Sequence, residues 1–276
     1  MQPEKLINWG SFSGFAELTG FVAGVDGWLF RGQPIYENQG LTTSLERAAA
    51  FLGEDALALE KRTLREFKRR AALSGAETLP HDSATVEWLA LLQHFGAPTR
   101  LLDFTHSIYV ATFFAVERAA NDAEVWCVRR SALPSNLKEP WSGNKDFALE
   151  LLLDPERAKR KMPGLQIGPP PCAVFCDEPY YLNKRLSLQK GCFLIPFDVS
   201  KSFRENLLSG APALRGAQDE QMKDFKDSLV KRDIFRIVLP KTQHREIRKE
   251  LRRMNMTREH LFPGLDGLAM SFWQES

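Results

Sequence analysis

The sequence predicts an α+β fold in which mixed or antiparallel β-strands are flanked by helices. Helical and strand-like hydrophobic patterns alternate along the chain with few regular strand–helix–strand repeats, which favours this class over a doubly wound sheet. The 276 residues are 43% hydrophobic and 26% charged, which excludes collagen-like, low-complexity and mostly disordered chains. No apolar run approaches the roughly 20 residues of a transmembrane helix, and the N-terminus lacks a secretory signal. We therefore expect a cytoplasmic protein with no membrane partner.

The elements can be assigned in order from apolar spacing and from helix-ending residues. In the helix expected at 55–72, for example, Leu57, Leu64, Phe67 and Ala71 recur at helical spacing. Asp82 or Ser83 is a predicted N-cap for the helix expected at 86–95, and Gly96 is placed to end this helix. The predicted elements are helix 15–22, strand 28–31, helix 55–72, helix 86–95, strand 99–105, helix 107–121, strand 124–129, helix 147–161, strands 172–176, 192–197 and 234–239, and a helical C-terminus, basic at 241–253 and apolar at 261–273.

The domain organisation is predicted to be a single domain over residues 1–276, because the sequence contains no internal repeat and no Gly/Ser-rich linker. Residues 130–171 hold many of the prolines, ending in Gly168-Pro-Pro-Pro171, and are predicted to form an insertion over one face of the domain. A second irregular stretch, 210–216, is predicted to be a mobile loop.

Metal and disulfide chemistry are not expected. The chain has four cysteines, and Cys172-x3-Cys176 has a spacing different from the Cys-x2-Cys pairs of most zinc ribbons. No histidine lies between Cys127 and Cys192. We predict free thiols and no metal site.

The first candidate for ligand binding is Phe30-Arg31-Gly32-Gln33, at the end of a predicted strand. The planar guanidinium of Arg31 can hold a phosphate or carboxylate through two hydrogen bonds, and Gly32 allows the backbone to pass close to a ligand. A surface arginine beside a turn glycine is an equally good interpretation of so short a pattern.

The second candidate is the run from Gln93 to Thr105, QHFGAPTRLLDFT. Asp103 and Thr105 stand at a strand end before a helix, so they can either cap that helix or contribute to a polar cradle for a phosphate or ribose. His94 and His106 could titrate near neutral pH.

A third candidate lies at 186–193, where the pattern predicts two strands joined by a tight turn at Lys190-Gly191. Gln189, just before this turn, can bind a ligand amide or hydroxyl, or pair only with backbone. Basic stretches at 61–70 and 241–253 form a fourth candidate, although the interleaved Glu246 and Glu250 favour an exposed helix over a nucleic-acid track.

Several common enzyme motifs are absent from the sequence. The chain contains no Gly-x4-Gly-Lys-Ser/Thr loop, no Gly-x-Gly-x-x-Gly fingerprint, no Gly-x-Ser-x-Gly elbow and no His-Glu-x-x-His. P-loop, kinase, dinucleotide oxidoreductase, serine hydrolase and zincin functions therefore lose their main support.

Taken together, the motifs resemble the FRG domain family. The resemblance rests on Phe30-Arg-Gly-Gln33, Leu41-Thr-Thr-Ser-Leu45 with Arg47, and the run from Gln93 to Thr105. It extends to Arg185, Gln189-x-Gly191-x-Phe193 and Phe262-Pro-Gly-Leu-Asp-Gly-Leu268. The resemblance implies a bacterial or phage protein near toxin or defence functions, and says little about activity.

The order of these segments is also similar, more distantly, to ADP-ribosyltransferases of the arginine–serine–glutamate type, whose fold is a split β-sandwich. This similarity implies an enzyme that uses NAD as substrate, with Arg31 as phosphate clamp. Gln33, Thr105 and Gln189 would position the nicotinamide riboside. Asp103 or His94 would act as acid/base or orienting group.

The sequence departs from that pattern at the expected catalytic glutamate, where Lys184-Arg185-Leu186 offers no carboxylate. That glutamate stabilises developing positive charge, which an arginine would repel. An NAD-utilising enzyme would either modify a protein or nucleic-acid acceptor or hydrolyse NAD. Two alternatives to such an enzyme stay open. One is an effector directed at nucleic acid through the basic helices, and the other is a non-catalytic nucleotide-binding sensor.

Overall fold

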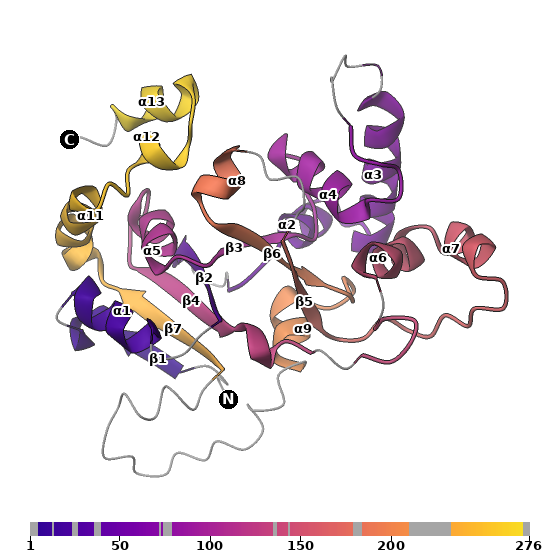
Figure 1. The fold of residues 1–276 in the computed structure, drawn as a ribbon, viewed down its shortest axis with the longest axis horizontal. Coiled ribbons are helices and arrows are strands. Elements are labelled where there is room, and N and C mark those ends of the chain that lie inside the picture. Colours follow the sequence, from indigo (N-terminus) through magenta and orange to yellow (C-terminus); the bar gives the residue numbers. More distant parts are fainter. Residues whose placement is uncertain are drawn as a thin grey trace, which may run out of the picture.

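Seven strands join into one sheet in the described part of the chain, with helices packed against it (Figure 1). The computed structural model describes residues 5–12, 14–23, 27–35, 40–71, 73, 79–134, 137–142, 144–178, 184–209 and 233–272. The strand order is β1-β7-β4-β2-β3-β6-β5, antiparallel throughout except for the parallel β1–β7 pair. The strands are β1 (Lys5–Asn8), β2 (Trp28–Pro34), β3 (Leu102–Thr105), β4 (Ala123–Arg129), β5 (Val174–Asp177), β6 (Gly191–Pro196) and β7 (Ile234–Leu239).

The α+β class and the mixed, mostly antiparallel strands flanked by helices are confirmed. Among the described residues no helix is both long and apolar enough to cross a membrane. The helices are α1 (Phe15–Ala23), α2 (Ser44–Leu52), α3 (Ala56–Ala71), α4 (Thr85–His94), α5 (Ile108–Val116), α6 (Lys145–Leu153), α7 (Pro155–Lys161), α8 (Lys184–Leu188), α9 (Phe203–Ser209), α11 (His244–Arg253), α12 (Arg258–Leu261) and α13 (Leu265–Ser271), with short 3₁₀ turns η1 (Trp9–Ser11), η2 (Arg130–Ala132) and η4 (Lys241–Gln243).

Most predicted elements are present within a few residues, but several boundaries and one element type are wrong. The strand predicted just before Lys190 is helix α8, and the helix predicted at 147–161 is two helices that break at Asp154-Pro155. The helix predicted at 107–121 ends at Val116, and the strand predicted from Thr99 begins at Leu102. The sequence prediction did not include β1, α2 or α9. The loop predicted at 210–216 lies outside the described residues.

The N-terminus of α4 shows why one cap was predicted wrongly. Its N-cap is Ala84, which makes no side-chain hydrogen bond, and neither Asp82 nor Ser83 caps the helix. Instead the backbone N–H of Val86 donates to the Asp146 carboxylate, 2.8 Å away on α6. The helix is capped by a residue 60 positions away in the sequence. Its predicted end is confirmed, since Gly96 has a positive φ of 84°.

The sheet carries two separate buried clusters on one of its faces. One includes Phe30 of β2 and Phe235 of β7 and is covered by α1, α5 and α11. The other includes Phe193 and Ile195 of β6 and is covered by α3, α4, α6 and α7. The opposite face packs against α9. In Figure 1 these helix groups lie at opposite ends of the sheet, with β2 and β3 between them.

Strands β2 and β3 are held together by only one residue pair, Phe30 with Thr105. By contrast, β2 pairs with β4 along all seven of its residues, and β3 pairs with β6 along all four. Thr105 is the last residue of β3, and residues 102–104 of this strand have no partner on β2. The two strands therefore part beyond this pair, and the sheet opens between its two halves.

Helix α5 packs unusually closely on β2 at this opening, and Gly32 makes the approach possible. A Cβ on Gly32 would lie 1.6 Å from the backbone oxygen of Ala111 and 2.8 Å from the nitrogen of Ala115. Because the obstructing atoms are backbone atoms of a helix, no rotamer change could relieve the contact.

A fully buried ion pair ties α3 to the segment that leads into β3. The Arg100 Nε donates to Glu60 Oε2 at 2.8 Å, and both side chains are completely buried. Arg100 also donates to the carbonyl oxygens of Pro196 and Phe197, at the end of β6. The pair therefore connects a helix, β3 and β6 on one side of the opening.

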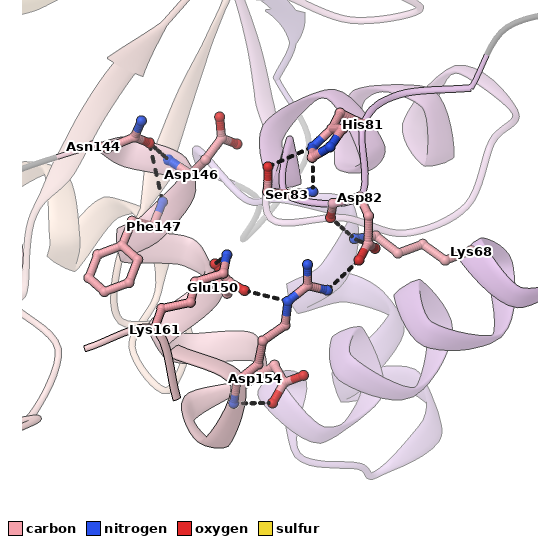
Figure 2. A network of polar contacts seen from close by, with 11 residues as sticks. Lys68, His81, Asp82, Ser83, Asn144, Asp146, Phe147, Glu150, Asp154 and Lys161 are labelled. Carbon is pink, nitrogen blue, oxygen red and sulfur yellow. Dashed lines mark hydrogen bonds and ion pairs between the residues drawn. The ribbon is translucent and has the colours of Figure 1, made fainter. Parts of the chain in front are cut away.

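A second polar network, shown in Figure 2, holds α6 and α7 against α3. Lys68 on α3 reaches Asp82 at 3.3 Å, and Arg157 on α7 reaches both Asp82 and Glu150. The nearly buried Glu150 also accepts from Lys161 at 2.6 Å. Through these contacts and through buried apolar residues of α6, part of the segment 130–171 packs into the second cluster.

Replacing Glu60 with Gln should lower the free energy of unfolding by about 3–5 kcal/mol, because the buried Arg100 charge would lose its counter-charge. Urea denaturation measures the change. The matched control is Glu54→Gln, whose exposed pair with Arg62 at 2.8 Å should contribute under about 1 kcal/mol. Equal effects of the two variants would contradict a structural role for the buried pair.

Gly32→Ala should destabilise the protein by about 1–3 kcal/mol or more, because the added methyl group forces α5 away from β2. Thermal and urea unfolding provide the measurement. Gly20→Ala on α1, where a Cβ would meet nothing within 4 Å, should instead leave stability unchanged or raise it by about 0.5–1 kcal/mol. An unaffected Gly32→Ala variant would show that the helix can be displaced without cost.

Candidate functional site

A cavity of about 580 Å³ lies at the opening between β2 and β3, bounded also by α5 and α8. We call it the cleft. This volume is in the usual range for small-molecule sites. Five of the six residues predicted from the sequence as site residues line it: Arg31, Gln33, Asp103, Thr105 and Gln189. The structure thus brings together side chains that are up to 158 positions apart in the sequence (from 31 to 189). His94 does not line the cleft.

Arg31 lies across the gap between the two strands. Its NH1 donates to the backbone oxygen of Asp103 at 2.7 Å and lies 4.0 Å from Asp103 Oδ2. Burial lowers the pKa of the Arg31 guanidinium, while the nearby Asp103 carboxylate acts in the opposite direction. Arginine nevertheless stays charged at neutral pH. Arg31 therefore offers a fixed, partly desolvated positive charge to the cleft.

Gln33 accepts a hydrogen bond from Arg31 and donates one to a buried carboxylate. Its Oε1 accepts from Arg31 Nε at 3.4 Å, and its Nε2 donates to Glu124 Oε1 at 2.9 Å. Glu124 is almost completely buried on β4 and also accepts from Trp126 Nε1 and Arg236 NH1, both at 2.8 Å. The amide of Gln33 is thus used to orient Arg31, in addition to lining the cleft.

Asp103 provides the only carboxylate among the described residues that line the cleft. Its side chain is 64% exposed, and Oδ1 accepts from Gln93 Nε2 at 2.9 Å. It does not cap α5, because that role belongs to Ser107, whose hydroxyl accepts from the N–H of Val110. Helix capping, the alternative interpretation of Asp103, is therefore wrong for this residue.

Thr105 and Gln189 are bound to backbone groups that shape the cleft. The Thr105 hydroxyl donates to the carbonyl oxygen of Gln189 at 2.6 Å and accepts from the N–H of Ser107 at 3.0 Å. Gln189 is nearly buried, and its Nε2 donates to the carbonyl of Leu261 at 3.1 Å. These bonds join β3, the turn before β6 and helix α12.

Two further arginines line the cleft that we had not predicted as binding residues, Arg47 on α2 and Arg185 on α8. The capping box Thr43-x-x-Glu46 was a readable signal for α2 and hence for the position of Arg47. Burial lowers the pKa of Arg185, and Asp103 opposes the shift. The Arg185 guanidinium lies 4.5 Å above the ring of Phe262, which in turn packs against Phe114 of α5 at 5.8 Å.

Other candidates from the sequence lie elsewhere. The exposed ring of His94 packs against Phe95, at 5.1 Å between ring centroids. All four cysteines are free, and no cluster of three potential metal-binding residues occurs in the part of the chain that the structure describes.

The basic helices α3 and α11 lie at opposite ends of the ribbon (Figure 1). On α3, several arginines are paired with Glu54 and Glu66.

Comparison with known families gives one match. Residues 26–124 match the FRG domain. This part of the chain is an FRG domain. No curated protein and no solved structure matches the chain.

The FRG domain spans the segment from just before β2 to the start of β4 and so contributes Arg31, Gln33, Arg47, Asp103 and Thr105 to the cleft. Arg185 and Gln189 come from beyond the matched residues. The cleft is therefore closed by chain outside the FRG match, which is shorter than the resemblance noted in the sequence from the N-terminal region to the C-terminus.

The cleft should bind inorganic pyrophosphate, and Arg31→Gln should weaken this binding at least tenfold, because a charge-assisted hydrogen bond contributes about 1.5–3 kcal/mol. Isothermal titration calorimetry at fixed ionic strength gives the affinities. Arg160→Gln removes the same charge from the exposed end of α7 and should change the affinity less than twofold. A similar loss in both variants would indicate a general charge effect and no defined anion site.

Proposed function

We propose that the chain is an NAD-utilising enzyme, either an ADP-ribosyltransferase or an NAD glycohydrolase, and that the cleft is its active site. The observation that carries the proposal is the combination of three guanidinium groups with one exposed carboxylate around a single, partly apolar cavity. Such a charge arrangement suits a ligand with a diphosphate at one end and a reacting sugar near the carboxylate.

The diphosphate would be held by the arginines of the cleft. Arg31, Arg47 and Arg185 give it three positive charges against the one negative charge of Asp103. The resulting excess of two charges matches the two negative charges of a dinucleotide diphosphate. The apolar part of the lining, including Phe114 and Val110, favours a ligand that also carries planar or apolar groups.

Asp103 would act on the ribose that carries nicotinamide. The bond between the ribose C1′ and the nicotinamide nitrogen breaks, and its electron pair leaves with neutral nicotinamide. The Asp103 carboxylate stabilises the resulting oxocarbenium-like charge and can accept the proton of the attacking water or acceptor hydroxyl. This role replaces the glutamate that ADP-ribosyltransferases of the arginine–serine–glutamate type carry near a position occupied here by Arg185.

The two alternative functions make different demands on these residues. A nucleotide-binding sensor needs the arginines and does not need Asp103. A nucleic-acid effector would use α3 and α11, but their separation and their interleaved carboxylates do not favour one continuous phosphate track. A toxin or phage-defence role, a macromolecular acceptor and a cytoplasmic location remain predictions.

Purified protein incubated with NAD should release nicotinamide, and Asp103→Asn should lower the rate at least a hundredfold while ADP-ribose still binds. Chromatography of nicotinamide and calorimetry with ADP-ribose measure the two properties. His94→Ala is the matched control, since His94 lies near Asp103 in sequence and outside the cleft, and its rate should stay within threefold.

Release of nicotinamide that is unaffected by Asp103→Asn would contradict the assigned chemistry. ADP-ribose binding without any nicotinamide release would favour the sensor. The absence of both would remove NAD from the function of this cleft.

A further inference from the structure

Gln93, on the last turn of α4, does not line the cleft but contacts the Asp103 carboxylate directly. Its Nε2 lies 2.9 Å from Asp103 Oδ1, whereas the Arg31 guanidinium lies 4.0 Å from Oδ2. The two carboxylate oxygens therefore have different environments. Oδ1 accepts a hydrogen bond from an amide, and Oδ2 lies on the side of the arginine.

The direction of the amide is determined by the hydroxyl of Thr99. The backbone N–H of Leu101 donates to Thr99 Oγ1 at 3.3 Å, and Thr99 Oγ1 in turn donates to Gln93 Oε1. A flipped amide would place Gln93 Oε1 against Asp103 Oδ1, two acceptors facing each other. The chain of donors thus runs in one direction, from backbone through hydroxyl and amide to the carboxylate.

Thr99 is well fixed for this purpose. Its side chain is completely buried, its backbone N–H donates to Ser44 Oγ at 3.0 Å, and its carbonyl accepts from the N–H of Leu45 at 3.0 Å. Both partners belong to the first turn of α2, the helix that carries Arg47. The same anchor therefore connects an arginine of the cleft with the hydrogen bonds that hold Asp103.

We propose that Gln93 is a positioning residue for the reaction, which holds Asp103 Oδ1 through the Thr99–Gln93 pair so that Oδ2 is directed to the ribose of the substrate. The inference rests on the proposed function. It assigns to Gln93 a role in turnover and not in binding of the diphosphate, because Gln93 does not line the cleft and lies behind the carboxylate.

The activity test compares variants that change one hydrogen bond at a time. Gln93→Met keeps the length of the side chain without its amide, and Thr99→Val keeps its shape without the hydroxyl. Each should lower kcat for nicotinamide release about 10-fold or more, with KM for NAD changed less than threefold, because each variant disturbs the hydrogen bond that holds Asp103 and leaves the arginines of the cleft unchanged.

Thr99→Ser retains the hydroxyl and should restore kcat to within threefold of the unmodified protein. Gln93→Glu should be poorly active at pH 8, where two carboxylates face each other, and should recover relative to the unmodified protein toward pH 5, where the introduced group can donate a proton to Asp103. A purely structural Gln93 would not give this reversal of the pH dependence. Equal losses in the serine and valine variants would overturn the proposal.

A spectroscopic test does not depend on activity. In ¹H–¹⁵N spectra of the unmodified protein, one side-chain amide proton of Gln93 should appear downfield, as expected for donation to a carboxylate. Asp103→Asn and Thr99→Val should both move it toward the positions of solvent-exposed amides, while Thr99→Ser should not.

An unshifted Gln93 amide, or one insensitive to Asp103→Asn, would overturn the inference even if NAD is consumed. The downfield amide together with an absence of nicotinamide release would instead leave the hydrogen-bond arrangement intact and contradict the proposed function. The two failures are thereby distinguished.

Discussion

The cleft exists because β2 and β3 are joined by only one residue pair, Phe30 with Thr105. A fully paired ladder would place these strands about 4.8 Å apart along their whole length and leave no space between them. Because the strands separate, the backbone oxygen of Asp103 is free to accept from Arg31. The side chain of an arginine thus takes the place of missing backbone hydrogen bonds, and its charge is brought to the wall of a cavity.

The two strands on either side of the opening need rigid support, because each has lost part of its ladder. On the β2 side, the support comes from Glu124, which holds Gln33 and Arg236 in the sheet. On the β3 side, the buried Glu60–Arg100 pair connects α3 with the ends of β3 and β6. Buried ion pairs contribute little net stability, but removal of one partner is costly. Both networks therefore favour one geometry of the opening.

The opening between β2 and β3 also explains how a closely packed helix and two polar side chains reach the same cavity. Gly32 has no side chain, so α5 can contact β2, whereas its neighbours Arg31 and Gln33 point to the other side of the strand. Alternation along a strand places such neighbours on opposite faces. At the opening both faces border the cleft, so that a helix and two polar side chains contribute to one cavity. The C-terminal segment supports two lining residues from outside the cavity: the carbonyl of Leu261 accepts from Gln189, and the ring of Phe262 lies against the Arg185 guanidinium.

The sequence by itself determined the elements whose signals are local. The periodicity of α3, the apolar strands β2, β4 and β7 and the glycine that ends α4 were all predictable, because each follows from a few neighbouring residues. Polar residues in and near the predicted strands also stand out against an apolar pattern, and five of the six residues picked out in this way line the cleft; their role in binding or catalysis stays a prediction. The cap of α4 by Asp146 and the helical form of α8 were not predictable. Only the tertiary structure decided that β2 and β3 part after one pair, that His94 lies outside the cleft and that Gln93 holds Asp103, because those relations depend on which distant segments pack together and not on the local chemistry of any one of them.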